Sequence, residues 1–200
     1  MKQMTFKEYR SVDLMLLAVL VIVFEAIATY ASGKWFYLQA INISVSLVLI
    51  CIVMLRWSGL AVIHAALGGF VYCFAAGATM EQFFIYCIGN VFSLLALVLI
   101  KIYGKEKIRT SPLRLAVFAT VAYLGMELGR CIVSVLFGGS IEALLVYITT
   151  DIVSLLFTVV VLILLRKSDG LLEDQKAYLL RVERERKEES GVYEENDVIL

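Results

Sequence analysis

Histidine, proline and recognisable catalytic motifs are scarce in this sequence. It holds one histidine and one proline in 200 residues, and it contains no HExxH, no phosphate-binding P-loop and no glycine-rich nucleotide fingerprint. A rhomboid-like protease would need a serine and a histidine, and an aspartyl intramembrane protease would need two membrane aspartates. We therefore expect no enzymatic activity, no cofactor and no nucleic-acid partner.

Cysteine is present but not in a pattern that predicts chemistry. All four cysteines lie inside apolar runs, away from any CxxC spacing: Cys51, Cys73, Cys87 and Cys131. Neither a disulfide framework nor a metal site fits that placement. We interpret them as small buried hydrophobic side chains.

Long apolar runs make up most of what remains. The chain is 61% hydrophobic, and six runs approach or exceed the roughly 20 residues that cross a bilayer as a helix. None shows the alternation of a membrane barrel. The runs are Leu14–Ser32, Phe36–Leu55, Trp57–Gly77, Gln82–Ile100, Leu113–Phe137 and Ile141–Leu165. We predict an all-α membrane protein whose residues 1–167 form six transmembrane helices in the lipid bilayer.

The basic residues outside these runs predict the orientation. If the spans alternate, only Lys34 lies on one side. The other side carries Lys2, Lys7, Arg10, Arg56, Lys101, Lys105, Lys107, Arg109 and Arg114. Because basic loops stay inside, both termini are predicted to be cytoplasmic, with only short loops outside.

The last part of the chain, residues 168–200, is a charged tail. Its apolar residues Leu171, Leu172, Tyr178, Leu179 and Val182 lie among acidic and basic ones. This pattern favours a short cytoplasmic amphipathic helix, with frayed chain after residue 190. The apolar stripe could lie on the bilayer, dock on a partner subunit, or belong to a solvated helix with no partner.

Ionisable residues inside the runs are expensive in lipid and indicate a functional site. Counting about 1.5 Å per residue from the outer ends places Glu25 and Arg130 about 10 Å deep. The same count places Glu127 and Asp151 about 15 Å deep and Asn90 about 12 Å deep. We predict one polar layer in the outer half of the membrane.

Tyrosines accompany this layer at helical spacing. The pairs Tyr86 and Asn90, Tyr123 and Glu127, and Tyr147 and Asp151 are each four residues apart, so each pair shares a helix face. Aromatic rings with a few polar groups suit a small-molecule pocket. The alternative is an internal salt bridge of Arg130 with Glu127 or Asp151. The surplus of acid favours a cationic or donor-rich ligand.

Small residues line one face of the third run. Ala61, Ala65 and Gly69 recur every fourth residue, with Gly68 alongside. This spacing lets two helix backbones approach closely, either within the chain or with another subunit. His64, on the same run, lies far from the polar layer, and we interpret it as hydrogen-bonded packing.

Three strings carry a family resemblance. RWSG at 56–59, IHAALGG at 63–69 and IYCIGN at 85–90 resemble substrate-binding S components of bacterial energy-coupling factor (ECF) vitamin transporters, among members with no settled substrate. The resemblance covers residues 5 to about 180. The AxxxA docking pattern of many members is missing on the first helix, since Ile22 follows Ala18 at the fourth position.

The resemblance implies a protein in the bacterial cytoplasmic membrane that captures a vitamin-like micronutrient from outside. The loops near Trp35, 78–81 and 138–141 would close over the ligand. A separate membrane coupling (T) subunit and two ATPase subunits would then drive delivery. Two other functions remain open: a non-transporting membrane subunit of another complex, whose buried charges only join helices, and a small ion-coupled transporter.

Overall fold

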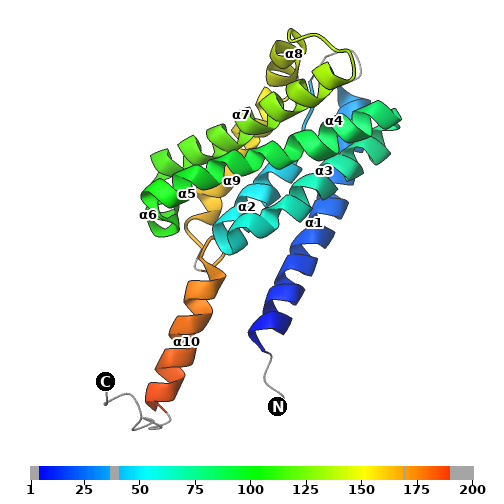
Figure 1. Ribbon diagram of the computed structural model, residues 1–200. Coiled ribbons are helices and arrows are strands. Elements are labelled where there is room, and N and C mark those ends of the chain that lie inside the picture. Colours follow the sequence, from blue (N-terminus) through cyan, green and yellow to red (C-terminus); the bar gives the residue numbers. More distant parts are fainter. Residues whose placement is uncertain (1–4, 37–40, 169, 190–200) are drawn as a thin grey trace.

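The computed structural model describes residues 5–36, 41–168 and 170–189, and every regular element in these ranges is a helix. Figure 1 shows them as one tilted bundle with a projecting C-terminal helix. The elements are α1 (Phe6–Trp35), α2 (Ser46–Trp57), the 3₁₀ turn η1 (Ser58–Leu60), α3 (Ala61–Ala76), α4 (Met80–Val91), η2 (Phe92–Ala96), α5 (Leu97–Tyr103), α6 (Lys105–Thr110), α7 (Pro112–Leu136), α8 (Ala143–Thr150), α9 (Ile152–Leu165) and α10 (Gln175–Glu189).

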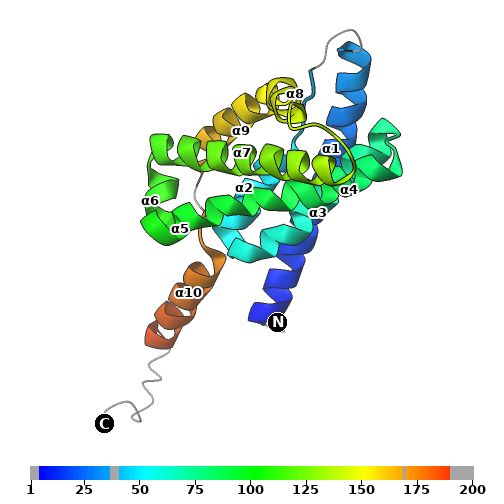
Figure 2. The same cartoon turned by 45° about the horizontal axis from the view of Figure 1, so that its top comes forward.

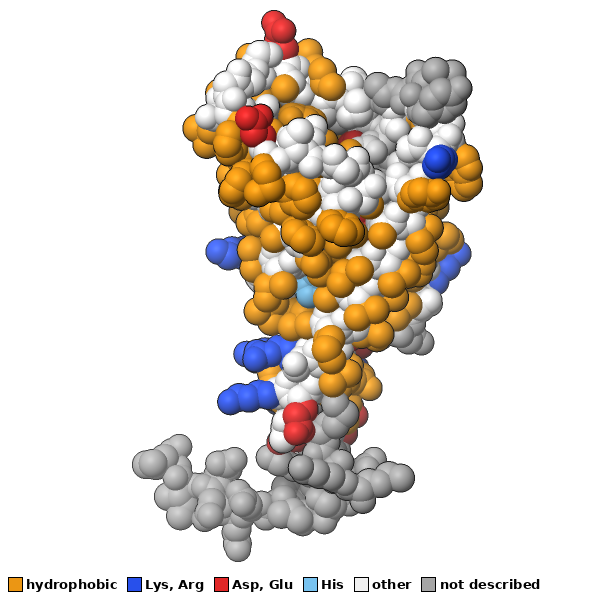
Figure 3. Space-filling model, turned by 90° about the vertical axis from the view of Figure 1, so that its right-hand side faces the viewer, with side chains coloured by type: hydrophobic (Ala, Val, Ile, Leu, Met, Phe, Trp, Pro, Cys, Tyr) orange, Lys and Arg blue, Asp and Glu red, His pale blue; other side chains and the backbone are white. Residues whose placement is uncertain are grey.

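The helix lengths and hydropathies confirm an all-α, multi-pass membrane protein. Four helical runs in the described chain are long and apolar enough to cross a membrane: Phe6–Trp35, Ser46–Ala76, Met80–Tyr103 and Pro112–Leu136. The pair α8 and α9, bent by 44°, makes a fifth candidate. Figure 3 shows apolar side chains covering much of one flank of the body. The six crossings and the cytoplasmic termini stay predictions.

The apolar run from α2 to α3 folds back on itself. Ser58, between them, has a φ of 55°, which breaks the helix. A Cβ at Gly68 of α3 would lie 2.6 Å from the Cβ of Ser46, at the far end of α2. Residues 46 and 68 can meet only if the two helices are antiparallel, so α2 and α3 form a hairpin. These legs correspond to the second and third predicted spans.

The predicted helix Phe36–Leu55 is wrong in its first part. Residues 41–45 are not helical, and α2 begins only at Ser46; residues 37–40 lie outside the described chain. With 12 residues, α2 is about 18 Å long. Every one of its residues is buried, as expected for a short helix that is apolar on all sides. It is the central helix of the bundle.

Two other predicted helices differ from the observed ones because the observed helices are interrupted. The predicted helix Gln82–Ile100 is longer, from Met80 to Tyr103, with η2 inside it. The predicted helix Ile141–Leu165 is broken at Asp151 into α8 and α9. The helix predicted over Leu113–Phe137 is confirmed as α7, which Ser111 caps. The short helix α6 lies in a predicted loop.

Small residues bring the helices close together inside the bundle. The predicted contact residues Ala61, Ala65, Gly68 and Gly69 are all buried. A Cβ on Gly69 would lie 2.5 Å from the backbone oxygen of Tyr86, so α3 touches the backbone of α4. A Cβ on Gly129 of α7 would lie as close to the carbonyl of Gly89. The small residues of α3 therefore serve contacts within the chain.

The tail is anchored at one end of the bundle. Figures 1 and 2 place α10 at the same end as the start of α1. Arg56 donates to both carboxylate oxygens of Asp13 at 3.0 and 2.6 Å and to the carbonyls of Gly170 and Leu171 at 3.0 and 2.9 Å. The Trp57 indole donates to the same Asp13. The predicted tail helix is present only from Gln175 on, as α10, so Leu171 and Leu172 of the predicted apolar stripe precede it. The fraying predicted after residue 190 lies outside the described residues.

Candidate functional site

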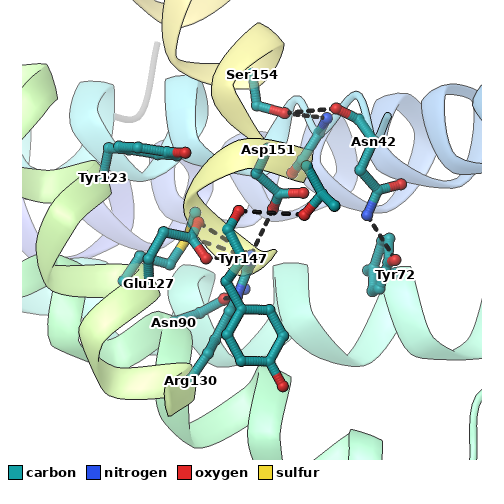
Figure 4. A network of polar contacts seen from close by, with 12 residues as sticks. Asn42, Tyr72, Asn90, Tyr123, Glu127, Arg130, Tyr147, Asp151 and Ser154 are labelled. Carbon is teal, nitrogen blue, oxygen red and sulfur yellow. Dashed lines mark hydrogen bonds and ion pairs between the residues drawn. The ribbon is translucent and has the colours of Figure 1, made fainter. Parts of the chain in front are cut away.

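Three helical legs bring four of the predicted polar residues together. The Arg130 side chain of α7 donates from Nε to Asn90 Oδ1 of α4 at 2.9 Å. Its Nη1 donates to both oxygens of Glu127 at 3.1 Å and to Asp151 at the break between α8 and α9. Figure 4 shows Arg130 between the two carboxylates. These four residues are called the Arg130 cluster below.

The Arg130 cluster is closed to solvent. Glu127 is 0% exposed, Asn90 is 1%, and Arg130 and Asp151 are 2% each. Buried charges are tolerated only where partners and hydrogen bonds compensate the lost hydration. Here one guanidinium donates hydrogen bonds to two carboxylates and an amide, which leaves the four groups with one more carboxylate than cation. This geometry corresponds to the internal salt-bridge alternative.

The predicted tyrosines divide into two groups. Tyr86 lies against Arg130, whose guanidinium carbon is 4.5 Å from the ring centroid, and Tyr147 meets the Tyr86 ring edge-on at 6.3 Å. Tyr123 instead donates to the carbonyl of Ile148, which ties α7 to α8. Tyr86 and Tyr147 therefore cover the Arg130 cluster, whereas Tyr123 serves a helix contact.

Glu25 has a separate task at the start of α2. Its Oε2 accepts from the backbone N–H groups of Val45 and Ser46 at 2.8 and 2.7 Å and from the Ser44 hydroxyl at 3.1 Å. A carboxylate at a helix N-terminus satisfies free N–H groups and meets the positive end of the helix dipole. Glu25, 0% exposed, thus explains why α2 starts inside the protein.

The non-helical segment before α2 is held by a second set of hydrogen bonds. Ser44 N–H donates to Ser154 Oγ at 2.8 Å, and Ser154 donates to the carbonyl of Asn42 at 3.3 Å. The N–H of Asn42 donates to the carbonyl of Thr150 at 2.9 Å. Non-helical backbone at membrane depth is tolerated only where protein groups satisfy it. The segment 42–46 is therefore built into the core between α1 and α9.

A cavity of about 430 Å³ opens beside this segment. Its lining is polar and aromatic as well as apolar: Thr29, Tyr30, Ser32, Gly33, Lys34, Phe36, Ile41, Asn42, Tyr72, Ala75 and Ala76. The volume lies in the range of small-molecule sites. The C-terminal ends of α1 and α3 form its walls, so it lies at the end predicted to face outward. We call it the outer cavity.

The outer cavity connects with the Arg130 cluster through two tyrosines. Asn42 donates from Nδ2 to the Tyr72 hydroxyl at 2.6 Å, and the rings of Tyr72 and Tyr86 lie 4.6 Å apart. Tyr86 in turn lies against Arg130. Figure 4 shows Asn42 and Tyr72 on one side of the cluster. A change in the cavity wall can therefore reach Arg130 through direct contacts.

The cavity lining differs from the predicted site residues. None of the nine predicted ligand-binding residues lines it: Glu25, Trp35, Tyr86, Asn90, Tyr123, Glu127, Arg130, Tyr147 and Asp151. Trp35 is 76% exposed. Sequence reasoning missed Asn42 and Tyr72. One signal was available, because Asn42, Ser44 and Ser46 alternate with apolar residues, a period that indicates extended chain.

Metal binding and similarity to known proteins add no further site. In the described ranges no group of three or more His, Cys, Asp or Glu residues is placed to hold a metal ion. His64 is buried, and its Nε2 lies 3.0 Å from the carbonyl of Leu14.

Comparison of the chain with protein-family models, with curated proteins and with solved structures gives no match.

Proposed function

We propose that this protein is the substrate-capture S subunit of an ATP-driven ECF-type importer in a bacterial cytoplasmic membrane, with both termini inside. It takes a vitamin-like small molecule into the outer cavity. A separate coupling (T) subunit and two ATPase subunits then drive delivery into the cell, and the chain itself catalyses nothing. The observation that carries this proposal is the cavity of about 430 Å³ beside the segment 42–46.

The cavity wall supports recognition of a polar ring compound. Hydroxyls of Thr29, Ser32 and Tyr72 and the amide of Asn42 supply donors and acceptors. Tyr30 and Tyr72 supply aromatic surface, and the Lys34 ammonium lies 5.7 Å from the centroid of the Tyr30 ring. A few polar groups on an aromatic wall orient a ligand while its apolar surface is buried.

The charge of the wall changes the ligand class that the sequence favoured. A cationic ligand was expected from the surplus of carboxylates, but Glu127 and Asp151 face Arg130 and do not line the cavity. Lys34 is the one Lys, Arg, Asp or Glu among the described lining residues. We therefore propose a neutral or anionic ligand with acceptor oxygens beside its ring.

Capture is tested by mass spectrometry of small molecules that remain with the gently purified protein. Ala76→Phe fills the cavity from α3 and should reduce the retained ligand at least tenfold. Ile63→Phe, on the exposed face of the same helix and outside the lining, should leave it unchanged. Retention of the same molecule by both variants, or no small molecule in the unmodified protein, would overturn the proposal.

Energy coupling is tested in cells that also make a T-type subunit and the paired ATPases. Uptake should stop on ATP depletion, and the chain should co-purify with these partners. Uptake that stops only when an ion gradient is dissipated would identify an ion-coupled transporter instead.

One observation favours a second function, a non-transporting subunit of another membrane complex. The Arg130 cluster is closed, so its charges can act only as contacts among α4, α7 and the α8–α9 break. In that case the chain should purify stably with an unrelated membrane complex, and the Ala76→Phe variant should assemble normally with it.

A further inference from the structure

A second hollow, on the flank of the bundle, is almost entirely apolar. It has a volume of about 440 Å³ and runs between α1 and α9 with α2 as its floor. Leu16, Leu20 and Phe24 of α1 form one wall, and Phe157 and Val161 of α9 form the other. Leu16 is 57% exposed and Phe24 is 48% exposed, so the groove opens sideways toward the surrounding medium.

The groove has the length of one membrane leaflet. Along α1 it extends from Asp13 to Phe24, and a helical segment between these positions spans about 16 Å. Half of a hydrocarbon core of about 30 Å is about 15 Å. The groove also has a charged end, where Asp13 and Arg56 line it, and a purely apolar opposite end at Phe24 and Val45. An apolar slot of leaflet length with one charged end matches the shape of a membrane lipid.

A basic hollow adjoins that charged end. It has a volume of about 260 Å³ and shares Arg56 with the groove. Its lining includes four basic side chains, Arg10, Arg56, Lys105 and Lys176, and one acidic side chain, Asp174. Asp13 balances Arg56 through their ion pair at 2.6 Å, and Asp174 pairs with Lys105 at 2.8 Å. Arg10 and Lys176 therefore leave the hollow with a net positive charge.

We propose that the groove and the basic hollow together bind one anionic phospholipid, with an acyl chain along α2 and the phosphate at Arg10 and Lys176. The charge of the hollow selects an anionic headgroup, because basic residues near a membrane surface each favour anionic lipid by about 1 kcal/mol. The lipid also covers the flank on which the central helix α2 forms the floor of the groove. This site is distinct from the outer cavity and does not depend on what that cavity binds.

The test uses fluorescence quenching by lipids brominated on their acyl chains. Two variants are compared in a Trp35→Phe background, and the quenching of the remaining Trp57, measured in that parent, is subtracted from both. They are Leu16→Trp at the groove and Leu128→Trp on the exposed face of α7, where Leu128 is 42% exposed in the native protein. In mixed vesicles, brominated phosphatidylglycerol should displace phosphatidylcholine from the groove tryptophan with at least about a fivefold preference. The α7 tryptophan should show no preference. Equal quenching at both positions would overturn the proposal.

The role of the basic hollow is tested by charge removal. Arg10→Gln with Lys176→Gln should abolish the preference at the groove tryptophan. Lys7→Gln with Lys101→Gln removes the same charge outside the hollow and should leave the preference intact. An equal loss in both pairs would mean that general surface charge causes it, which contradicts a defined site. Loss of the preference on adding millimolar inorganic phosphate would identify a free-anion site and would also contradict the lipid.

Discussion

Two arginines hold the two ends of this bundle, and they do so in different ways. Arg56 pairs with one carboxylate and two backbone carbonyls, and the side chains of the Arg56–Asp13 pair are 10% and 12% exposed. Arg130 pairs with two carboxylates and an amide, with side-chain exposures of 3% for Arg130, 0% for Glu127 and 3% for Asp151. The first is a charge-balanced pair near water, and the second is a dry cluster with more acid than base. The environment of an arginine, more than its number of hydrogen bonds, decides what its loss would cost.

The largest expected effect follows from removing the buried arginine. Arg130→Met leaves Glu127 and Asp151 facing each other without a cation, so we expect a loss of about 3–5 kcal/mol in stability. Thermal unfolding in detergent measures it. Adding Glu127→Gln and Asp151→Asn to Arg130→Met removes the two charges and should restore much of the loss. No recovery in the triple variant would mean that packing, not charge, causes the effect.

Removal of the more exposed arginine should cost less. Arg56→Met leaves Asp13 with the Trp57 indole and with access to water, so we expect a loss of about 1–3 kcal/mol. It should also release the tail, because the carbonyls of Gly170 and Leu171 lose their donor. Limited proteolysis should then cut near residue 170 faster than in the native protein, whereas Arg130→Met should leave that rate unchanged. Equal cleavage in both variants would contradict the anchoring role.

Salt concentration should distinguish the two clusters. Raising the ionic strength from low salt to about 1 M shortens the screening length from tens of ångströms to about 3 Å. The energetic cost of Arg56→Met should therefore shrink with added salt, while that of Arg130→Met should not change. A parallel decrease in both would show that water and ions reach the Arg130 cluster.

The smallest effect is expected at a surface pair. Arg109 donates to both oxygens of Glu106 at 2.8 and 2.9 Å, yet the Glu106 side chain is 67% exposed. Glu106→Gln should change stability by less than about 1 kcal/mol. The same measurement serves as the baseline for the two arginine variants. If Glu106→Gln lowered stability as much as Arg56→Met does, burial could not explain why the two arginine variants differ in stability.

The sequence predicted the helical class and the meeting of Arg130, Glu127, Asp151 and Asn90, because a depth count along apolar runs places polar groups at one level. Depth alone does not give the direction in which a side chain points around the bundle. Glu25 lies near the same level, but it faces the start of α2 and caps it. Sequence reasoning missed the cavity residues Asn42 and Tyr72. Asn42 lies in non-helical chain, inside a run of the sequence that looks continuously apolar.

The cap on α2 has a consequence for biogenesis. Glu25 lies within α1, while its three hydrogen-bond donors, Ser44, Val45 and Ser46, follow 19 to 21 residues later. Until then the carboxylate has no donor from α2, and α2 itself is too short to partition alone. We therefore expect α1 and the α2–α3 hairpin to enter lipid together, as one unit.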